Sequence, residues 1–119
     1  MDRRSIGTQG EEIAAQFLME RGYQIVSRNF HCRFGEVDII ARKNEYLVFV
    51  EVKLRKNTEY GAPREYVTFT KQKKIKMTAA YYLTFHQENT MVRFDVIEII
   101  APNGTDYGFT VHHLENAFQ

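Results

Sequence analysis

The chain has 119 residues, of which 44% are hydrophobic and 26% are charged, and its net charge is +1. This length is typical of one domain with a buried core, which excludes a wholly disordered chain, and no apolar run approaches the roughly 20 residues of a transmembrane helix. The single cysteine excludes an internal disulfide and the N-terminal segment has no apolar signal stretch, so we expect one cytoplasmic domain over residues 1–119.

The charges are unevenly distributed along the chain. Residues 42–76 contain ten Lys and Arg against four Glu, a net charge of +6, so the remaining 84 residues carry −5. A basic middle segment favours an anionic partner such as nucleic acid. A solvated helix face would explain the same charges equally well.

The first predicted helix covers residues 9–21. Thr8 and Glu11 have the spacing of a capping box, and Gly22 is a typical helix stop. Glu11 lies at the edge of the apolar face of this helix, whereas Glu12 and Gln16 point away from it. The apolar face consists of Ile13, Ala14, Ala15, Phe17 and Leu18.

Three β-strands follow, rich in Val, Ile, Phe and Tyr, and cover residues 23–30, 36–42 and 46–55. Residues 43–46 form a short polar turn between the last two, and residues 56–63 are a predicted loop.

A second helix is predicted over residues 70–86, with Ile75, Ala79, Tyr82 and His86 on its buried face. Residues 91–100 form a strand apolar enough to be buried on both faces, and the tail from 107 to 119 contains a further strand. The order is therefore α-β-β-β-α-β with one more strand. Because a helical crossover follows a three-strand meander, the fourth strand should lie parallel to the third in a mixed α/β sheet with helices packed on it.

Strand register brings two carboxylates together. Side chains alternate along a strand, so Glu36, Asp38 and Ile40 are expected on one face. A two-residue turn at 44–45 pairs Lys43 with Tyr46 and places Asp38 directly opposite Glu51. A three-residue turn would place the Asp38 carboxylate among apolar side chains, so matching of the faces favours the shorter turn.

Two opposed carboxylates need a partner of opposite charge. At about 5 Å they repel by about 3 kcal/mol at an effective dielectric constant near 20. A divalent cation bound to both would remove this cost, and Lys53 projects from the same face as Glu51. Two carboxylates, a lysine and a metal ion are suited to phosphodiester hydrolysis. Alternatively, Lys53 or Arg55 simply neutralises Glu51 in a surface cluster of charges.

The chain closely resembles the uncharacterised bacterial YraN-like family. The resemblance covers nearly the whole chain and is carried by residues 7–14 (GTQGEEIA), 28–33 (RNFHCR), 35–40 (GEVDII), 48–55 (VFVEVKLR), 61–63 (GAP), Lys71 and 116–118 (NAF). That family resembles the restriction-endonuclease-like, or PD-(D/E)xK nuclease, superfamily and is similar in layout to archaeal Holliday-junction resolvases.

The resemblance implies a restriction-endonuclease-like α/β fold and a role for each matching residue. Asp38 matches the metal-binding aspartate of the superfamily motif, Glu51 and Lys53 match its (D/E)xK, and Glu11 matches a glutamate of the first helix. Val37 stands where the motif has proline, at a position that does no chemistry.

These observations predict a metal-dependent nuclease that acts on DNA, including branched or damaged duplexes. Asp38 and Glu51 would hold Mg²⁺, or alternatively Mn²⁺, with Glu11 and the Val52 carbonyl as further ligands, and Lys53 would assist catalysis. Phosphates would bind a basic set that consists of Arg55, Lys56, Lys71, Lys73, Lys74 and Lys76. A nucleic-acid-binding module without turnover and a protein-binding adaptor are the alternatives. We expect nucleic acid as partner, no membrane, and a homodimer as an assembly to test.

Several polar residues allow two interpretations. Lys71 either points along the sheet toward the metal site or extends to solvent, and Gln72 is expected to be solvated rather than directed at the site. His112 and His113 are adjacent on a strand, so their rings should diverge. Asp95 either caps a loop or pairs with an arginine such as Arg28 or Arg93, and Cys32 is expected to be structural.

Overall fold

The computed structural model describes residues 3–57, 67–86 and 90–119. The predicted loop at 56–63 lies largely outside these residues. The elements are α1 (Arg3–Glu20), β1 (Gln24–Cys32), β2 (Gly35–Lys43), β3 (Tyr46–Arg55), α2 (Phe69–His86), β4 (Met91–Ile100) and β5 (Thr110–Phe118). Neither helix has the length and apolarity to span a membrane.

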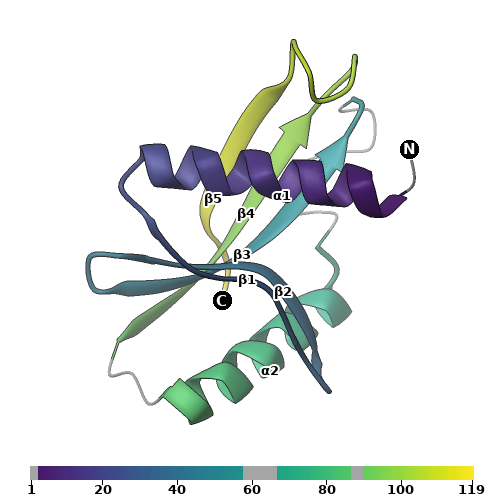
Figure 1. Ribbon diagram of the computed structural model, residues 1–119. Helices are drawn as coiled ribbons and strands as arrows, with labels where there is room; N and C mark the ends of the chain where they lie inside the picture. The colour runs from purple at the N-terminus through teal and green to yellow at the C-terminus, as the bar shows by residue number, and fades with distance from the viewer. Residues whose placement is uncertain (1–2, 58–66, 87–89) are drawn as a thin grey trace.

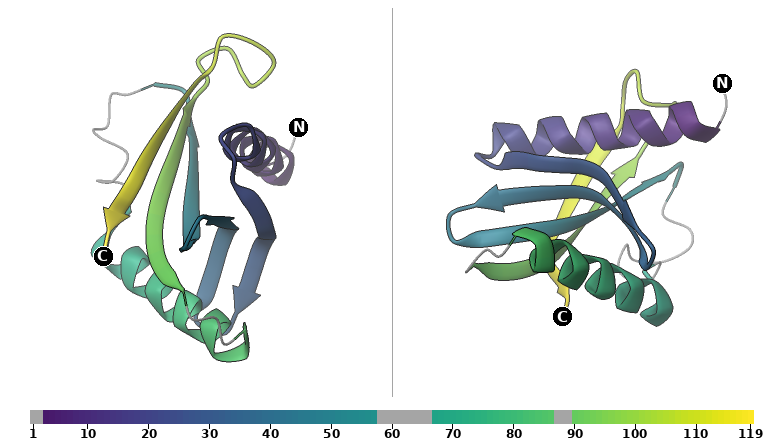
Figure 2. Two further views of the ribbon diagram at one scale, coloured as in Figure 1. Left: turned by 90° about the vertical axis from the view of Figure 1, so that its left-hand side faces the viewer. Right: turned by 60° about the horizontal axis from the view of Figure 1, so that its bottom comes forward.

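The described strands form one mixed sheet in the order β1-β2-β3-β4-β5 (Figure 1). Neighbours are antiparallel except β3 and β4, which are parallel, as the predicted helical crossover requires. Helices α1 and α2 cover opposite faces of the sheet (Figure 2). The predicted mixed α/β sheet and its element order are therefore confirmed.

Each helix packs on the sheet through its own hydrophobic core. Ala14 and Leu18 of α1 pack with Val48 and Val50 of β3, and the half-buried Ile13 and Phe17 extend this core as predicted. On the other face, the core of α2 consists of Val37, Ile40, Leu47, Phe49, Val67, Ile75, Ala79, Tyr82, Val96 and Phe118. Because β3 and β4 lie between both helices, residues 95–99 of β4 are buried on both faces.

Helix α1 begins at Arg3, six residues before the predicted start. Thr8 therefore lies inside the helix, and its assignment as N-cap is wrong. Once a helix has formed, each further residue adds one hydrogen bond. The capping-box spacing at Thr8 was therefore not enough to end α1 on its N-terminal side. The predicted stop at Gly22 is confirmed: its φ is +87°, and Tyr23 N–H donates to the Leu18 carbonyl at 3.0 Å.

The start of α2 is set by Thr68, which the sequence analysis did not identify as a cap. Its hydroxyl oxygen accepts a hydrogen bond from the Lys71 N–H at 3.1 Å. At the other end, the prediction that His86 is buried is wrong. Its ring is exposed and stacks on Tyr82, with centroids 3.8 Å apart. His86 is the last residue of α2 and lies one turn beyond Tyr82, the last buried residue of the helix, so its imidazole is at the surface.

The sheet divides beyond the pair Ile39 and Val50. The β2–β3 ladder runs from Lys43↔Tyr46 to Ile39↔Val50, which confirms the two-residue turn and the predicted register. Further along, the pairs among the described residues join β2 to β1 and β3 to β4, and none joins β2 to β3. We call this place the fork. In Figure 2 the β1–β2 hairpin diverges from the β3–β4–β5 part of the sheet.

Strand β2 rotates at the fork. Val37 and Ile40 pack in the core of α2, whereas Ile39 packs in the core of α1. Strict alternation cannot place residues 37 and 40 on one face, so the prediction that Glu36, Asp38 and Ile40 share a face is wrong. The neighbouring strand is irregular at the same level, because Asn29 of β1 has a φ of +55°. Asp38 therefore lies where the strand turns.

Candidate active site at the fork

Asp38 and Glu51 lie on the two strands that separate at the fork. The Asp38 Oδ2 atom accepts a hydrogen bond of 2.7 Å from the Val52 N–H, one residue beyond Glu51. The Glu51 side chain is only 7% exposed. The register that predicted their proximity holds up to the adjacent pair, Ile39↔Val50. Two carboxylates are thus held at the boundary of the sheet rather than in its regular ladder.

Both carboxyl groups resist ionisation. Burial, and then the charge of Glu51, raise the pKa of Asp38 to about 7, although the hydrogen bond from Val52 partly opposes the shift. Burial also raises the pKa of Glu51, and the charges of Lys71 and Lys53 oppose that shift. A bound cation would stabilise the charged form of both groups, so this pair favours cation binding.

Two lysines extend toward the same carboxylate. The Lys53 Nζ atom lies 3.6 Å from Glu51 Oε1, and the Lys71 Nζ atom lies 4.0 Å from the same oxygen. Lys71 comes from the first turn of α2, so of its two interpretations the structure favours the one directed at the site. About a third of each lysine side chain is exposed, 36% for Lys53 and 34% for Lys71. Both are therefore accessible to an anionic substrate.

Glu11 of α1 is the third acidic residue at the site. It is half-buried, and its charge contributes to the raised pKa of Asp38. Among the residues that the structure describes, no three His, Cys, Asp or Glu side chains converge to ligate one metal ion. Two carboxylates with hard oxygen donors still fit Mg²⁺, which usually takes one or two carboxylates and keeps several waters.

The basic residues predicted to bind phosphate are in different environments. Lys56, Lys73 and Lys74 are exposed. Arg55, in contrast, pairs with buried Glu98 and is only 16% exposed, so the structure does not place it on the predicted phosphate-binding surface. Glu98 was not predicted from the sequence, although a carboxylate inside an apolar strand is the same signal that pointed to Glu51. Lys76 is half-buried, and its ammonium group donates to the main-chain carbonyl of Gln119.

Gln72 has a local structural role. Its Nε2 atom donates to the Val67 carbonyl at 2.8 Å, just before α2 begins. The side chain is half-buried, so the prediction of a solvated glutamine is wrong. The side-chain amide of a glutamine in the first turn of a helix can donate to a carbonyl that precedes the helix. In Gln72 this hydrogen bond replaces one to water.

Asp95 forms a second buried cluster, on β4, where it is paired with Val50 of β3. It is 0% exposed and accepts two hydrogen bonds from Arg93, at 2.9 and 2.8 Å, and one from the Asn116 N–H at 2.9 Å. His113 Nε2 lies 2.7 Å from its Oδ2. Burial by itself would raise the pKa of Asp95, but the hydrogen bonds from His113, Arg93 and Asn116 outweigh it and hold the pKa below its usual value.

This cluster decides between the interpretations of its members. Arg93 is the arginine that pairs with Asp95, whereas Arg28 pairs with Glu12 at 2.8 Å. His112 is exposed, and His113 packs edge-on against Phe17 and Tyr23, so the predicted divergence of the two rings is confirmed.

Comparison with known proteins places the chain in a family. A family model described as "Uncharacterised protein family UPF0102" matches residues 10–99. The chain belongs to this family. The matched UPF0102 segment includes Glu11, Asp38, Glu51, Lys53 and Lys71, and it confirms the resemblance noted from the motifs.

Relatives named UPF0102 protein match the chain over most of its length. The protein of Caldicellulosiruptor saccharolyticus is 43% identical, over 99% of this chain and 100% of its own length. That of Lachnoclostridium phytofermentans is 50% identical, over 84% of this chain and 86% of its own length. That of Clostridium botulinum is 44% identical, over 98% of this chain and 95% of its own length. The UPF0102 chain is thus comparable in extent to these relatives.

Proposed function

We propose that this UPF0102 chain is a metal-dependent nuclease that hydrolyses phosphodiester bonds in DNA, including branched or damaged duplexes, in the cytoplasm. The observation that supports this most is the charge arrangement at the fork. Two carboxylates with raised pKa lie beside two lysines whose Nζ atoms are within 4.0 Å of Glu51 Oε1. The layout also resembles that of restriction-endonuclease-like nucleases, as the motif implies.

Asp38 and Glu51 would hold the metal ion, Mg²⁺ or Mn²⁺, from the two sides of the fork. Glu11 would assist from α1, and the Val52 carbonyl is the proposed main-chain ligand. Such an ion supplies a water of lowered pKa and stabilises negative charge on the phosphoryl oxygens. The Val52 N–H keeps Asp38 oriented, because it holds one carboxylate oxygen at 2.7 Å.

The two lysines would act on the substrate rather than on the ion. Lys53 lies two residues from Glu51 on the same strand, where its ammonium group would orient the attacking water or bind a phosphoryl oxygen. Lys71 approaches from α2 and would hold a phosphate next to the reacting one. A phosphodiester brings negative charge to both, and charge-assisted hydrogen bonds of this kind are the strong ones.

Phosphates further along the DNA would bind the exposed lysines Lys56, Lys73 and Lys74. Such contacts give affinity and orientation but carry no direct sequence information. The proposal therefore favours recognition of DNA structure over recognition of a base sequence.

The proposal is tested by incubating the protein with Mg²⁺ or Mn²⁺ and linear, nicked or branched DNA, with RNA in parallel. Lys53→Ala is the variant expected to lose cleavage. Lys43→Ala is its matched control, because the Lys43 ammonium group donates to the Arg21 carbonyl near the end of α1 and has no role in the proposed DNA binding. Binding is measured separately with Ca²⁺. If the parent binds DNA but cleaves none of these substrates with either metal, the nuclease proposal is wrong and the binding module replaces it.

A further inference from the structure

Three aromatic rings, on the β1–β2 turn and α2, lie side by side outside the fork; Phe34 and Tyr81 are half-buried. The ring centroids of Phe34 and Tyr81 are 6.0 Å apart, and those of Tyr81 and Phe85 are 4.9 Å apart. The guanidinium carbon of Arg33 lies 4.8 Å from the Phe34 centroid. Phe85 is 67% exposed. We call Phe34, Tyr81 and Phe85 the aromatic surface.

The aromatic surface is held by close packing of the hairpin on the helix. The turn at residues 33–34 joins the pair Cys32↔Gly35. Gly35 has a φ of +148°, and a Cβ at this position would lie 3.2 Å from Thr78 Oγ1 of α2. Only glycine allows this approach without displacement. The rings are therefore presented by two elements that are fixed to each other.

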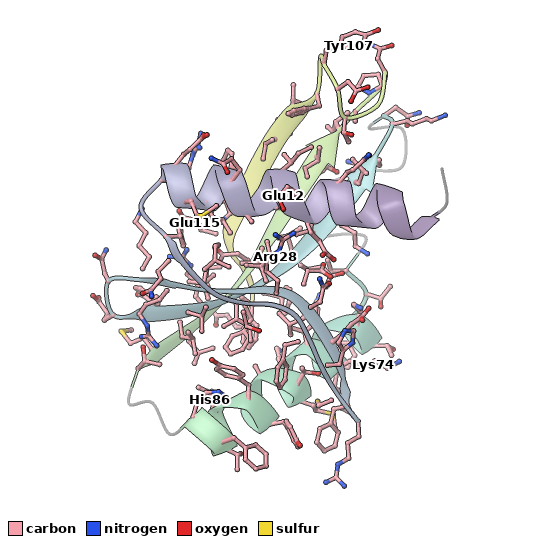
Figure 3. All side chains as sticks on the ribbon, in the orientation of Figure 1. Glu12, Arg28, Lys74, His86, Tyr107 and Glu115 are labelled. Atoms are coloured by element: carbon pink, nitrogen blue, oxygen red, sulfur yellow. The ribbon has the colours of Figure 1, made fainter. Side chains whose placement is uncertain are left out.

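Basic side chains flank the same surface. Helix α2 contains four lysines and no acidic residue, and Lys73, Lys74 and Arg33 are exposed. Figure 3 shows Lys74 beside the end of the β1–β2 hairpin and His86 at the far end of α2. Aromatic rings interleaved with exposed cations are the arrangement by which proteins bind single-stranded nucleic acid, with bases on the rings and phosphates on the cations.

We propose that the aromatic surface binds unpaired bases of a single DNA strand next to the site at the fork. This inference rests on the proposed function and specifies its substrate: DNA in which a single-stranded segment adjoins the phosphodiester that is cut. The bases of a duplex are stacked on one another and do not offer their faces to Phe85. A fully paired DNA would therefore contact the lysines and leave the rings unused.

The geometry of α2 connects the surface to the site. Lys71, whose ammonium group approaches Glu51, and Phe85 lie in the first and last turns of the same helix. At 1.5 Å per residue their separation along the helix axis is about 21 Å. Single-strand sites that combine a basic groove with stacking rings typically cover about 4–16 nucleotides, so one strand can occupy both ends of α2.

The test measures binding of a labelled single-stranded oligonucleotide and of its duplex, both with Ca²⁺. The variant is Phe85→Leu, which keeps an apolar side chain but removes the ring. Tyr107→Leu is the matched control, because Tyr107 is equally exposed, at 67%, and lies at the opposite end of the molecule (Figure 3). We expect Phe85→Leu to weaken single-strand binding by roughly 5- to 150-fold and Tyr107→Leu to leave it unchanged. Duplex binding should change in neither variant.

A second measurement uses Phe85→Trp, which introduces a tryptophan into a chain that has none. Stacking of a base should quench its fluorescence when the single strand is added, and addition of the duplex should not.

Equal single-strand affinity of Phe85→Leu and the parent, or a change of oligomeric state in Phe85→Leu, would overturn the inference. Cleavage is assayed in parallel: a parent that cleaves while Phe85→Leu binds normally disproves only the aromatic surface. A parent that never cleaves while Phe85→Leu binds weakly disproves only the nuclease.

Discussion

The Asp38 carboxylate accepts the main-chain N–H of Val52 at 2.7 Å, at the point where the β2–β3 ladder has just ended at Ile39↔Val50. A side chain thus links the two strands where their backbones have separated. The same contact keeps the Asp38 carboxyl beside Glu51, whose charge raises its pKa. Local sheet structure and the chemistry of the candidate site are therefore coupled through one residue.

Replacement of Asp38 by Asn should stabilise the metal-free protein at neutral pH. The unfolded carboxyl has a pKa of about 3.9, whereas that of folded Asp38 is about 7. Between these values the folded state holds the extra proton, so the stability of the parent falls as pH rises toward about 7. Asn at position 38 keeps an acceptor for the Val52 N–H but does not titrate. In urea unfolding with chelator, the free energy of unfolding of Asp38→Asn should rise relative to that of the parent between about pH 4 and about pH 7. A difference that is constant with pH would contradict the raised pKa.

Metal binding should depend on both carboxylates at the fork. Asp38→Asn and Glu51→Gln each remove one anionic oxygen ligand while the shape of the side chain is kept. We expect calorimetric titration with Mn²⁺ to show strongly weakened binding in both variants. Glu12→Gln is the control, because its exposed carboxylate pairs with Arg28 instead. Unchanged affinity in Asp38→Asn would remove Asp38 from the metal site.

Lys53 distinguishes catalysis from neutralisation of Glu51. If its ammonium group acts on the reacting phosphate, Lys53→Ala should lower the cleavage rate by about 10²- to 10³-fold, while DNA binding with Ca²⁺ changes little. If it only neutralises Glu51 at 3.6 Å, the variant should instead melt lower in chelator, recover with Mg²⁺ and cleave like the parent. Thermal melting and cleavage assays on the same preparations separate the two roles.

The buried cluster around Asp95 should contribute more to stability than an exposed ion pair. Asp95→Ala removes the common acceptor of Arg93, His113 and the Asn116 N–H at a position that is 0% exposed. We expect a loss of about 3–5 kcal/mol in the free energy of unfolding, because an uncompensated buried charge remains. Glu12→Ala, which breaks an exposed pair, should cost less than about 1 kcal/mol. Similar urea midpoints for the two variants would show that the cluster is not important for stability.

Lys73 and Lys74 should account for part of the salt dependence of DNA binding. If each contacts one phosphate, the double variant Lys73→Gln/Lys74→Gln should reduce the slope of log affinity against log salt by about two. The control double variant Arg21→Gln/Lys43→Gln changes the net charge equally, but in the parent both side chains bond main-chain carbonyls near the end of α1. Equal slopes in the two double variants would assign the lysines of α2 to general solvation.

Much of the architecture was predictable because it depends on short-range rules. The two-residue turn at 44–45 sets the pair Lys43↔Tyr46, and the side-chain period of two then fixes the register up to Ile39↔Val50. Likewise the period of an α-helix placed Ala14 and Leu18 in the core of α1. Turn length and periodicity depend on residues that are neighbours in the chain, so the register of β2 and β3 and the buried face of α1 were predicted correctly.

The assembly of the candidate site was decided only by tertiary structure. Asp38 accepts the Val52 N–H across the fork, Lys71 reaches Glu51 from α2, and Arg55 pairs with Glu98 instead of facing solvent. Each of these contacts joins segments far apart in the chain and depends on how the sheet divides and how each helix packs on it. The sequence by itself determined which acidic and basic groups the chain carries on each strand and helix. Long-range packing determined which of them meet, because the positions of separate elements are set by the cores between them and not by their own periodicity.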